Sequence, residues 1–507
     1  MAVTWNNEMR STRVLVIGAG FAGLGMAARL QRAGIRDFVV LEKAGDLGGT
    51  WRDNTYPGCA CDIPSVLYSY SFARGDGWSD ARARQPEILD YLRTLGSGFA
   101  DRIEFGAEVV RGEWDEGAAR WTVVTADGRA FEAQFLVAAT GALHLPKRPR
   151  IVGVDSFAGP VVHTADWDER IDLDGKRVAV IGTGASAAQL IPEIVERAGA
   201  VDVYQRTPAW VLPPLGTRPP RLPRLARIGW YWRAEATAPA FAGSTVASAL
   251  MHRRAVRHLH AQVADPELRR ALTPDHRIGC KRIIRSDNYF PALASGSTRV
   301  VTTAVGHVTP TGIVTADGVT RPADVLVYAT GFRVAGSLAA LPLTGRGGTT
   351  LQQRWMSGGV RTHHGITVAG MPNLFLLSGP NTGLGHNSVV FMIESQIRYV
   401  LDAIRALDRV GAAALDVREE VQEAVDAGVQ QRLRRAVWST GGCGSWYLDG
   451  RGRNHALWPG FSWKYRLRTR RVRLRDHHLI GASAGAFRSG QSPQRPLVLD
   501  GVRQTQR

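Results

Sequence analysis

Residues 13–23 read RVLVIGAGFAG, a continuous apolar run that ends in spaced glycines. A run without polar alternation is typical of a strand buried on both faces of a parallel sheet. Gly18 permits the tight turn, Gly20 lets backbone approach a pyrophosphate, and Gly23 lets the helix over residues 24–32 pack on the strand. The stretch therefore predicts an α/β fold in which phosphate charge meets a helix N-terminus.

A second apolar strand, residues 38–41, ends in Glu42, which follows Gly18 by 24 residues (42 − 18). A carboxylate at this place in a nucleotide-binding sheet can accept hydrogen bonds from ribose hydroxyls. The first loop is therefore predicted to bind an adenine dinucleotide.

Residues 176–187, KRVAVIGTGASA, repeat the strand and loop, with Gly182 and Gly184 conserving the turn and Ala187 replacing the third glycine. Arg206 follows Gly182 by 24 residues (206 − 182), where the first loop has its carboxylate. A guanidinium can bind the extra phosphate of NADP, which a carboxylate would repel. The second loop is predicted to bind NADPH, whereas a merely solvated Arg206 would leave a preference for NADH.

The length and charge limit the other possibilities. A chain of 507 residues is too long for one ordinary core, so two or three domains are expected. The net charge of +18 comes almost entirely from arginine, a bias typical of GC-rich genomes, and no recognition module accompanies it. We expect no nucleic-acid partner.

The cysteines and the apolar runs bear on location. Cys59, Cys61, Cys280 and Cys443 are too few for a disulfide scaffold and form no C-x-x-C pair, which fits a reducing cytoplasm. The first residues lack the apolar core of a signal peptide, and no apolar stretch reaches the roughly 20 residues that span a bilayer. We expect a cytoplasmic protein without an integral membrane segment and without a metal site.

Two longer motifs narrow the prediction to a family. Gly48-Gly49-Thr50-Trp51, Tyr56-Pro57-Gly58 and Asp62 follow the first loop, and Phe157, Gly159, His163, Trp167 and Asp168 lie between the two loops. Both sets resemble signatures of type I Baeyer-Villiger monooxygenases, and the resemblance covers about residues 11–470. It implies FAD on the first loop, NADPH on the second, and insertion of one oxygen next to a carbonyl through a C4a-peroxyflavin, giving an ester or lactone.

The resemblance also implies roles for single residues. Arg282, in Lys281-Arg282, would be the catalytic cation, and Asp62 would orient it. Phe157 to Asp168 would be a hinge, and Trp446 would lie on the substrate loop. The remaining residues implied in cofactor binding are Gly18, Gly20, Gly23, Glu42, Gly49, Thr50, Trp51, Tyr56, Gly182, Gly184, Ser186, Arg206, Thr207, Lys281 and Asn381.

The expected architecture is two Rossmann-like dinucleotide-binding domains, one for FAD and one for NADP, with a helical insert. The insert carries arginines beside Trp230 and Trp232, and we expect core aromatics with an arginine-bearing outer face in preference to a membrane-surface helix. The predicted segments are the FAD domain (1–148 and 333–475), the NADP domain (149–215 and 278–332), the insert (216–277) and a disordered basic tail (476–507).

Two other functions stay open. A flavin-containing monooxygenase that oxygenates nitrogen or sulfur shares both loops but typically lacks Trp167 and Asp168 of the fingerprint. A catalytically silent FAD-binding protein would use the loops for structure alone. A dithiol reductase is disfavoured because C-x-x-C is missing. The substrate, expected to be a small ketone or related carbonyl with O2, and the oligomeric state are not specified by these motifs.

Overall fold

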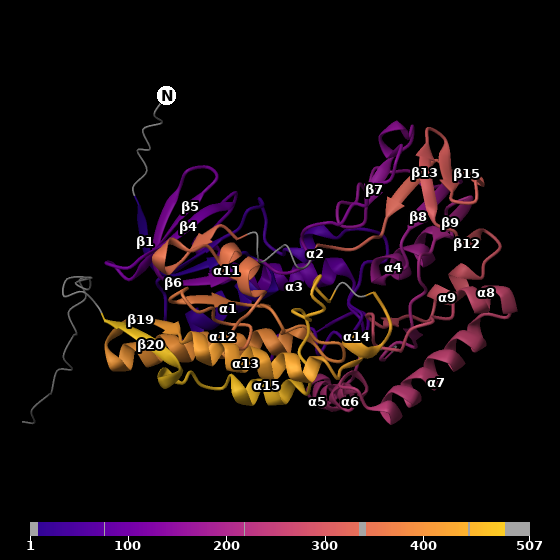
Figure 1. Cartoon of the computed structure of the whole chain (residues 1–507). Coiled ribbons are helices and arrows are strands. Elements are labelled where there is room, and N and C mark those ends of the chain that lie inside the picture. Colours follow the sequence, from indigo (N-terminus) through magenta and orange to yellow (C-terminus); the bar gives the residue numbers. More distant parts are fainter. Residues whose placement is uncertain (1–8, 76, 217–218, 334–340, 445–446, 482–507) are drawn as a thin grey trace, which may run out of the picture.

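The structure is a computed structural model that describes residues 9–75, 77–216, 219–333, 341–444 and 447–481. A mixed sheet in the first half and a parallel sheet in the second half are each covered by helices, which confirms the predicted α/β class (Figure 1). Within these described residues, no helix combines the length and the apolar character needed to cross a membrane.

We call the two parts of the molecule the first and the second half, and the first half is formed by both ends of the chain. It contains an eight-stranded sheet in the order β17-β4-β5-β6-β1-β2-β3, with β18 also paired to β6. β1 pairs in parallel with β2 and β6, and helices α1, α3 and α12 pack together beside it. The strands are β1 (Arg10–Ile17), β2 (Phe38–Leu41), β3 (Ile103–Glu104), β4 (Val109–Asp115), β5 (Arg120–Thr125), β6 (Ala130–Ala138), β17 (Leu343–Thr344) and β18 (Leu374–Leu376). The helices are α1 (Phe21–Arg32), α2 (Thr50–Asp53), α3 (Gln85–Ser97), α11 (Leu351–Gly358) and α12 (Val389–Val410).

The second half is a five-stranded parallel sheet in the order β12-β9-β8-β16-β7. A three-stranded antiparallel sheet, β13-β14-β15, is inserted in the chain between β12 and β16. The elements are β7 (Val161–His163), β8 (Arg177–Ile181), α4 (Ala185–Ile194), β9 (Ala200–Tyr204), α9 (Tyr289–Leu293), β12 (Thr298–Val301), β13 (Val305–Thr309), β14 (Gly312–Thr315), β15 (Thr320–Pro322) and β16 (Val325–Tyr328).

The helical insert lies along one edge of the molecule, where α5, α6 and α7 are seen together below the sheets (Figure 1). Its helices are α5 (Pro223–Glu235), α6 (Ala238–Phe241), α7 (Thr245–Gln262) and α8 (Pro266–Ala271). The strands on either side of it, β10 (Val211–Leu212) and β11 (Ile284–Arg285), pair with each other. The aromatic side chains do not all face the core as expected, because Trp232 is 56% exposed.

Buried polar groups hold the insert to the first half. The Glu235 carboxylate accepts hydrogen bonds from Asn387 Nδ2 at 2.8 Å and from Ser462 Oγ at 2.6 Å, and it lies 3.2 Å from His386 Nε2. Arg227 donates to the backbone oxygens of Val66 and Ser69. Since these partners fix only the inner side of α5, its outer side is left to solvent.

The C-terminal segment ends differently from the expectation. The elements there are β19 (Ala412–Val417), α13 (Glu419–Leu433), α14 (Val437–Thr440), α15 (Ser462–Arg468) and β20 (His477–Gly481). Residues 477–481 were predicted as part of a disordered tail, but they form β20, which pairs antiparallel with β19. Backbone pairing satisfies this segment although it has few apolar side chains. Residues 482–507 lie outside the described residues.

A buried histidine in the first half leads to a pH prediction. His363 is 4% exposed beside His364 and His477, and burial together with these neighbours lowers its pKa to about 2. An unfolded imidazole titrates near pH 6.5, so the unfolded state binds the proton first as the pH falls, and stability is lost below about 6.5. The free energy of unfolding should fall by about 1.4 kcal/mol per pH unit for such a histidine.

We expect His363→Gln to remove this share of the acid slope in urea unfolding between pH 6.5 and 5. His260→Gln, at an exposed position of α7, is the matched control and should leave the slope unchanged. Equal slopes for His363→Gln and the native protein would contradict the prediction.

Candidate active site

Asp62 and Arg282 are 220 residues apart in the sequence, and their side chains meet where the two halves of the molecule face each other. Arg282 Nε and Nη2 both donate to Asp62 Oδ2, at 3.0 and 2.5 Å. The side chain of Asp62 is 21% exposed and that of Arg282 is 51% exposed. The Asp62 carboxylate raises the pKa of Arg282 above its ordinary value, so the guanidinium is held as an oriented, accessible cation.

Further groups surround this pair that the sequence did not single out. Tyr447 is buried, and burial raises the pKa of its hydroxyl to about 12, with the charge of Arg282 acting in the opposite direction. Arg285, three residues after Arg282, donates to Pro213 O at 3.3 Å, and burial lowers its pKa to about 10 despite Asp62.

A narrow cavity of about 110 Å³ opens beside Asp62, between Arg82, Gln189 and Ile284. A larger hollow, of about 1260 Å³, lies against Trp167, Asp168 and Asp324. Neither Asp62 nor Arg282 is among the residues that line the larger hollow, so the smaller cavity is the one next to the candidate chemistry.

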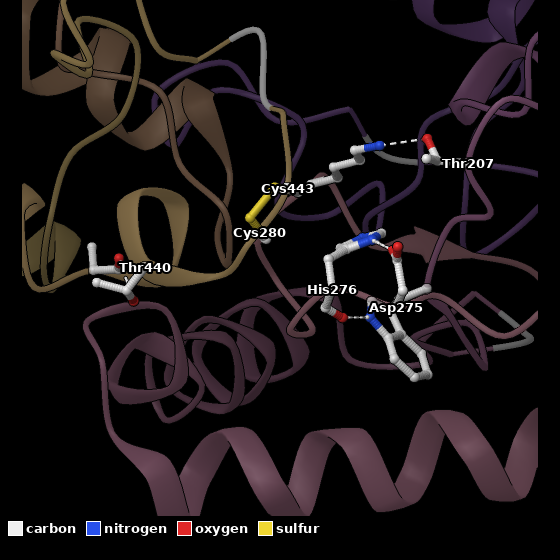
Figure 2. Close-up of a disulfide and its surroundings, with 9 residues drawn as sticks. Thr207, Asp275, His276, Cys280, Thr440 and Cys443 are labelled. Carbon is white, nitrogen blue, oxygen red and sulfur yellow. Dashed lines mark hydrogen bonds and ion pairs between the residues drawn. A yellow bond between two sulfur atoms is a disulfide. The ribbon is translucent and has the colours of Figure 1, made fainter.

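A disulfide joins the segment before Arg282 to a distant loop. Cys280 and Cys443, 163 residues apart, are bonded, and Figure 2 shows the bond between the two parts of the chain. Arg277 N donates to Gly441 O at 2.9 Å in the same contact. The small number of cysteines predicted no disulfide framework. This single bond holds Lys281-Arg282 against the loop that contains Cys443.

The first nucleotide loop has the geometry expected from its glycines. A Cβ on Gly23 would lie 1.8 Å from Gly18 O, so α1 packs on the turn too closely for any side chain there. Gly20 and Gly49 face each other, and a Cβ on either would lie nearest to the other's Cα, at 3.7 and 3.2 Å. The N-cap of α1, Gly20, makes no side-chain cap, which leaves backbone N–H groups available for an anion.

Glu42 and Thr140 lie next to this loop. Glu42 is buried and accepts from Ala19 N at 2.8 Å and from Ala44 N and Arg52 Nη1 at 3.1 Å. It therefore braces the loop, and its ribose contact stays a prediction. The hydroxyl of Thr140 is buried without a protein partner, which is a polar group that a bound molecule could satisfy.

The long signature ties the first loop to the second half of the chain. Tyr56 Oη donates to Gln189 Oε1 on α4 at 2.7 Å, and Gln189 Nε2 donates to Ala60 O at 2.9 Å. A Cβ on Gly58 would lie 2.4 Å from Gln189 O. Trp51 is buried and donates through Nε1 to Tyr68 Oη at 3.1 Å. Gln189 was missed because no local pattern marks it.

The second loop ends beside two cations. Arg206 is exposed, and Lys281 Nζ donates to Thr207 Oγ1 at 2.5 Å, the contact drawn in Figure 2. Burial and the charge of Arg206 lower the pKa of Lys281, with Asp275 acting in the opposite direction. Like charges brought together at a loop favour an anion between them. Gly184 begins α4 without a side-chain cap, and Ser186 is partly exposed in its first turn.

The fingerprint residues divide between core and surface. A Cβ on Gly159 would lie 2.1 Å from Asp324 O, and Phe157 is buried in the same region. His163 lies in β7 beside Tyr328, fully buried, and its Nε2 has no protein partner. Burial lowers the pKa of His163 to about 4, so it is neutral at pH 7. Asp168, in contrast, pairs with Arg170 at the surface.

Three further residues were predicted from the sequence to contact cofactor or substrate. The side chain of Asn381 donates to Asn454 O and Leu457 O, at 2.8 and 3.1 Å, and so holds loops together. Thr50 donates weakly to Leu143 O at 3.5 Å. Trp446 lies outside the described residues. In the part of the chain that is described, no three His, Cys, Asp or Glu side chains are placed to hold a metal ion.

This chain is similar to known proteins along most of its length. Residues 15–214 match the family described as pyridine nucleotide-disulphide oxidoreductase. A Baeyer-Villiger monooxygenase of Pseudomonas aeruginosa is 45% identical, over 94% of this chain and 93% of its own length. A Baeyer-Villiger monooxygenase of Streptomyces coelicolor is also 45% identical, over 92% of each.

The chain is also similar to solved structures of monooxygenases. A steroid monooxygenase bound to NADP superposes with a TM-score of 0.84 at 31% identity, over 93% of this chain and all of that one. The cyclohexanone monooxygenase of Rhodococcus sp. Phi1, bound to NADP+, gives 0.84 at 26% identity, over 94% of this chain and all of that one. The similarity therefore extends over both halves and the insert.

Proposed function

Because this chain belongs to the Baeyer-Villiger monooxygenases, we propose that Asp62 and Arg282 form its catalytic pair and that its substrate is a small ketone or related carbonyl. The enzyme depends on FAD and NADPH and inserts one oxygen atom of O2 next to the carbonyl, which gives an ester or lactone. The single observation that carries the proposal is the Asp62–Arg282 contact between the two halves of the chain.

The residues present fit both cofactors. The cradle between Gly20 and Gly49, the uncapped start of α1 and the unpartnered Thr140 hydroxyl suit the pyrophosphate end of FAD. Arg206 and Lys281 suit the extra phosphate of NADPH beside Gly184. When bound, the two cofactors supply the reducing equivalents and activate oxygen.

The chain's own residues supply charge and orientation. Arg282 offers a cation wherever negative charge develops on oxygen during the reaction, and it needs no proton transfer to do so. Asp62 accepts from two guanidinium nitrogens, which fixes the plane of that cation. The Cys280–Cys443 bond limits how far the Arg282 segment can move.

We further propose that residues 157–168 couple the two halves. Gly159 allows the backbone of the linker to pass against Asp324, and buried neutral His163 fixes the end of β7. Trp167 packs on the core shared with the first half. The linker therefore sets the position of the second half relative to the Asp62–Arg282 pair, and it does so without contacting that pair. The domain boundaries given from the sequence remain our proposal.

The product separates this function from oxygenation at nitrogen or sulfur. Purified holoenzyme should convert a ketone panel to esters with one NADPH and one O2 consumed per ester, measured by gas chromatography and oxygen uptake. A thioether offered alone should react more slowly. Fast sulfoxide formation without any ester would replace this proposal by the heteroatom reaction, and absence of NADPH-driven oxygen uptake would favour a silent FAD-binding protein.

Arg206→Ala should lower the efficiency ratio of NADPH to NADH. One bidentate, exposed contact to phosphate corresponds to roughly 1.5–3 kcal/mol, or about 10- to 100-fold in kcat/KM with NADPH. The NADH value should change little. Arg150→Ala, at another exposed arginine of the same half, is the control. An unchanged ratio would mean that the phosphate is held elsewhere.

We also propose a cytoplasmic location, where NADPH is generated, and no nucleic-acid partner. The disulfide is the described feature that argues against a reducing compartment, since structural disulfides are rare there.

A further inference from the structure

The outer face of α5 is apolar along its whole length. Leu222, at the N-cap, is followed at intervals of three or four residues by Leu225, Ile228 and Trp232. These four side chains are 64%, 65%, 58% and 56% exposed. Residues at this spacing lie on one side of a helix, and soluble proteins seldom expose such a continuous apolar strip without a partner.

Arginines border this strip, and carboxylates do not. Arg224 and Arg233 are exposed on α5, on opposite sides of the strip at 100° per residue. From residue 219 to 264 the sequence has one carboxylate, Glu235, and it is buried on the inner side of α5. The strip is therefore an apolar surface, and the exposed charged side chains that border it on α5 are all positive.

Neighbouring helices extend the same character. On α7, Val246 and Leu250 are 71% and 62% exposed, and exposed Arg253, Arg254 and Arg257 follow them. α15 is joined to α5 by the 3.1 Å contact between Tyr231 Oη and Ser462 Oγ. It exposes Lys464, Leu467 and Arg468. Figure 1 shows α5, α6, α7 and α15 along the same lower edge of the molecule.

The chemistry of the surface favours a lipid surface as its partner. Apolar side chains flanked by arginine match the boundary of an anionic bilayer, where guanidinium groups reach lipid phosphates while their stems lie along apolar atoms. A second copy docked by two-fold symmetry would bring the same arginines against each other, without acidic groups to offset them. The inner contacts of Glu235 and Arg227 fix α5 to the rest of the chain, so it can serve as a rigid docking face.

We propose that the surface of α5, the first half of α7 and α15 docks on anionic lipid bilayers. Leu225, Ile228 and Trp232 would enter the boundary between headgroups and acyl chains, with the bordering arginines on phosphates. The contact is peripheral and adds to the monooxygenase activity without depending on it. It places the side of the molecule that carries Arg233 on α5 and Arg254 on α7 against the membrane.

The test is flotation of the FAD-loaded, full-length enzyme with vesicles of phosphatidylcholine alone or with one quarter phosphatidylglycerol. The native enzyme should float with the anionic vesicles and bind less as salt is raised. Leu225→Glu combined with Ile228→Glu should lower the apparent partition coefficient about tenfold or more. Met356→Glu combined with Val110→Glu changes two exposed apolar residues of the first half and should bind like the native enzyme.

Rates of NADPH oxidation report folding of each variant, because none of these residues lies in the site. The proposal is overturned if the native enzyme binds no anionic vesicles, or if the Leu225/Ile228 variant binds them as well as native. It is also overturned if the variant changes a native dimer to a monomer by light scattering while vesicle binding is absent, since a second copy would then cover the face.

Discussion

Arg282→Ala is expected to lower ester formation about 10³-fold while NADPH is still oxidised. Arg282 is the accessible cation of the site, and Asp62 orients it through two hydrogen bonds. Without it, negative charge on oxygen has no fixed partner, whereas hydride transfer from NADPH does not require that charge. Oxygen uptake should therefore continue, with hydrogen peroxide in place of ester.

Three variants sharpen this prediction. Arg282→Lys keeps the charge but loses the fork to Asp62, so it should recover only part of the activity. Asp62→Asn should give a smaller loss than Arg282→Ala, because the guanidinium stays charged but is less well oriented. Arg277→Ala, at an exposed arginine of the same segment, is the control and should behave as native. Ester formation by Arg282→Ala within a few-fold of native would remove Arg282 from the catalytic role.

Gly23→Ala is expected to reduce the affinity for FAD by at least about 10- to 100-fold. Its Cβ would lie 1.8 Å from Gly18 O and 2.9 Å from Gly18 C, and both atoms belong to the backbone of the turn. Neither can move like a flexible side chain, so α1 must shift away from β1. Purified protein should contain little flavin by its absorbance, and its thermal midpoint should fall.

Two glycine variants separate folding from binding. Gly45→Ala is the control, since a Cβ there meets nothing within 4 Å. Gly20→Ala should fold normally, because its Cβ has only an ordinary contact to Gly49 at 3.7 Å, yet lose FAD because the methyl group enters the cradle. Native flavin content in Gly23→Ala would show that the loop can relax.

The second loop shows that the spacing of the motif alone does not tell whether its third position requires glycine. Ala187 occupies the place of the third glycine and is fully buried in the core. Both loops carry the same strand, turn and helix, but only the first needs glycine at this place. The distance between helix and turn decides this, and that distance depends on packing against the rest of each half.

The insert shows a second limit. The sequence of α5 has apolar residues on both sides of the helix, so periodicity could not tell which side is buried. We expected the aromatic residues in the core, and the structure instead exposes Trp232. The strand β20 was missed for a related reason, because backbone pairing with a distant strand leaves no apolar pattern.

The sequence by itself determined the two nucleotide loops, the order of the halves and the family, because these depend on residues that act within one turn or one strand. Only the tertiary structure decided which side chains meet. Asp62 with Arg282, Tyr56 with Gln189 and Cys280 with Cys443 are each separated by more than a hundred residues. Such contacts depend on how the sheets and helices pack, and short-range spacing carries no information about that packing.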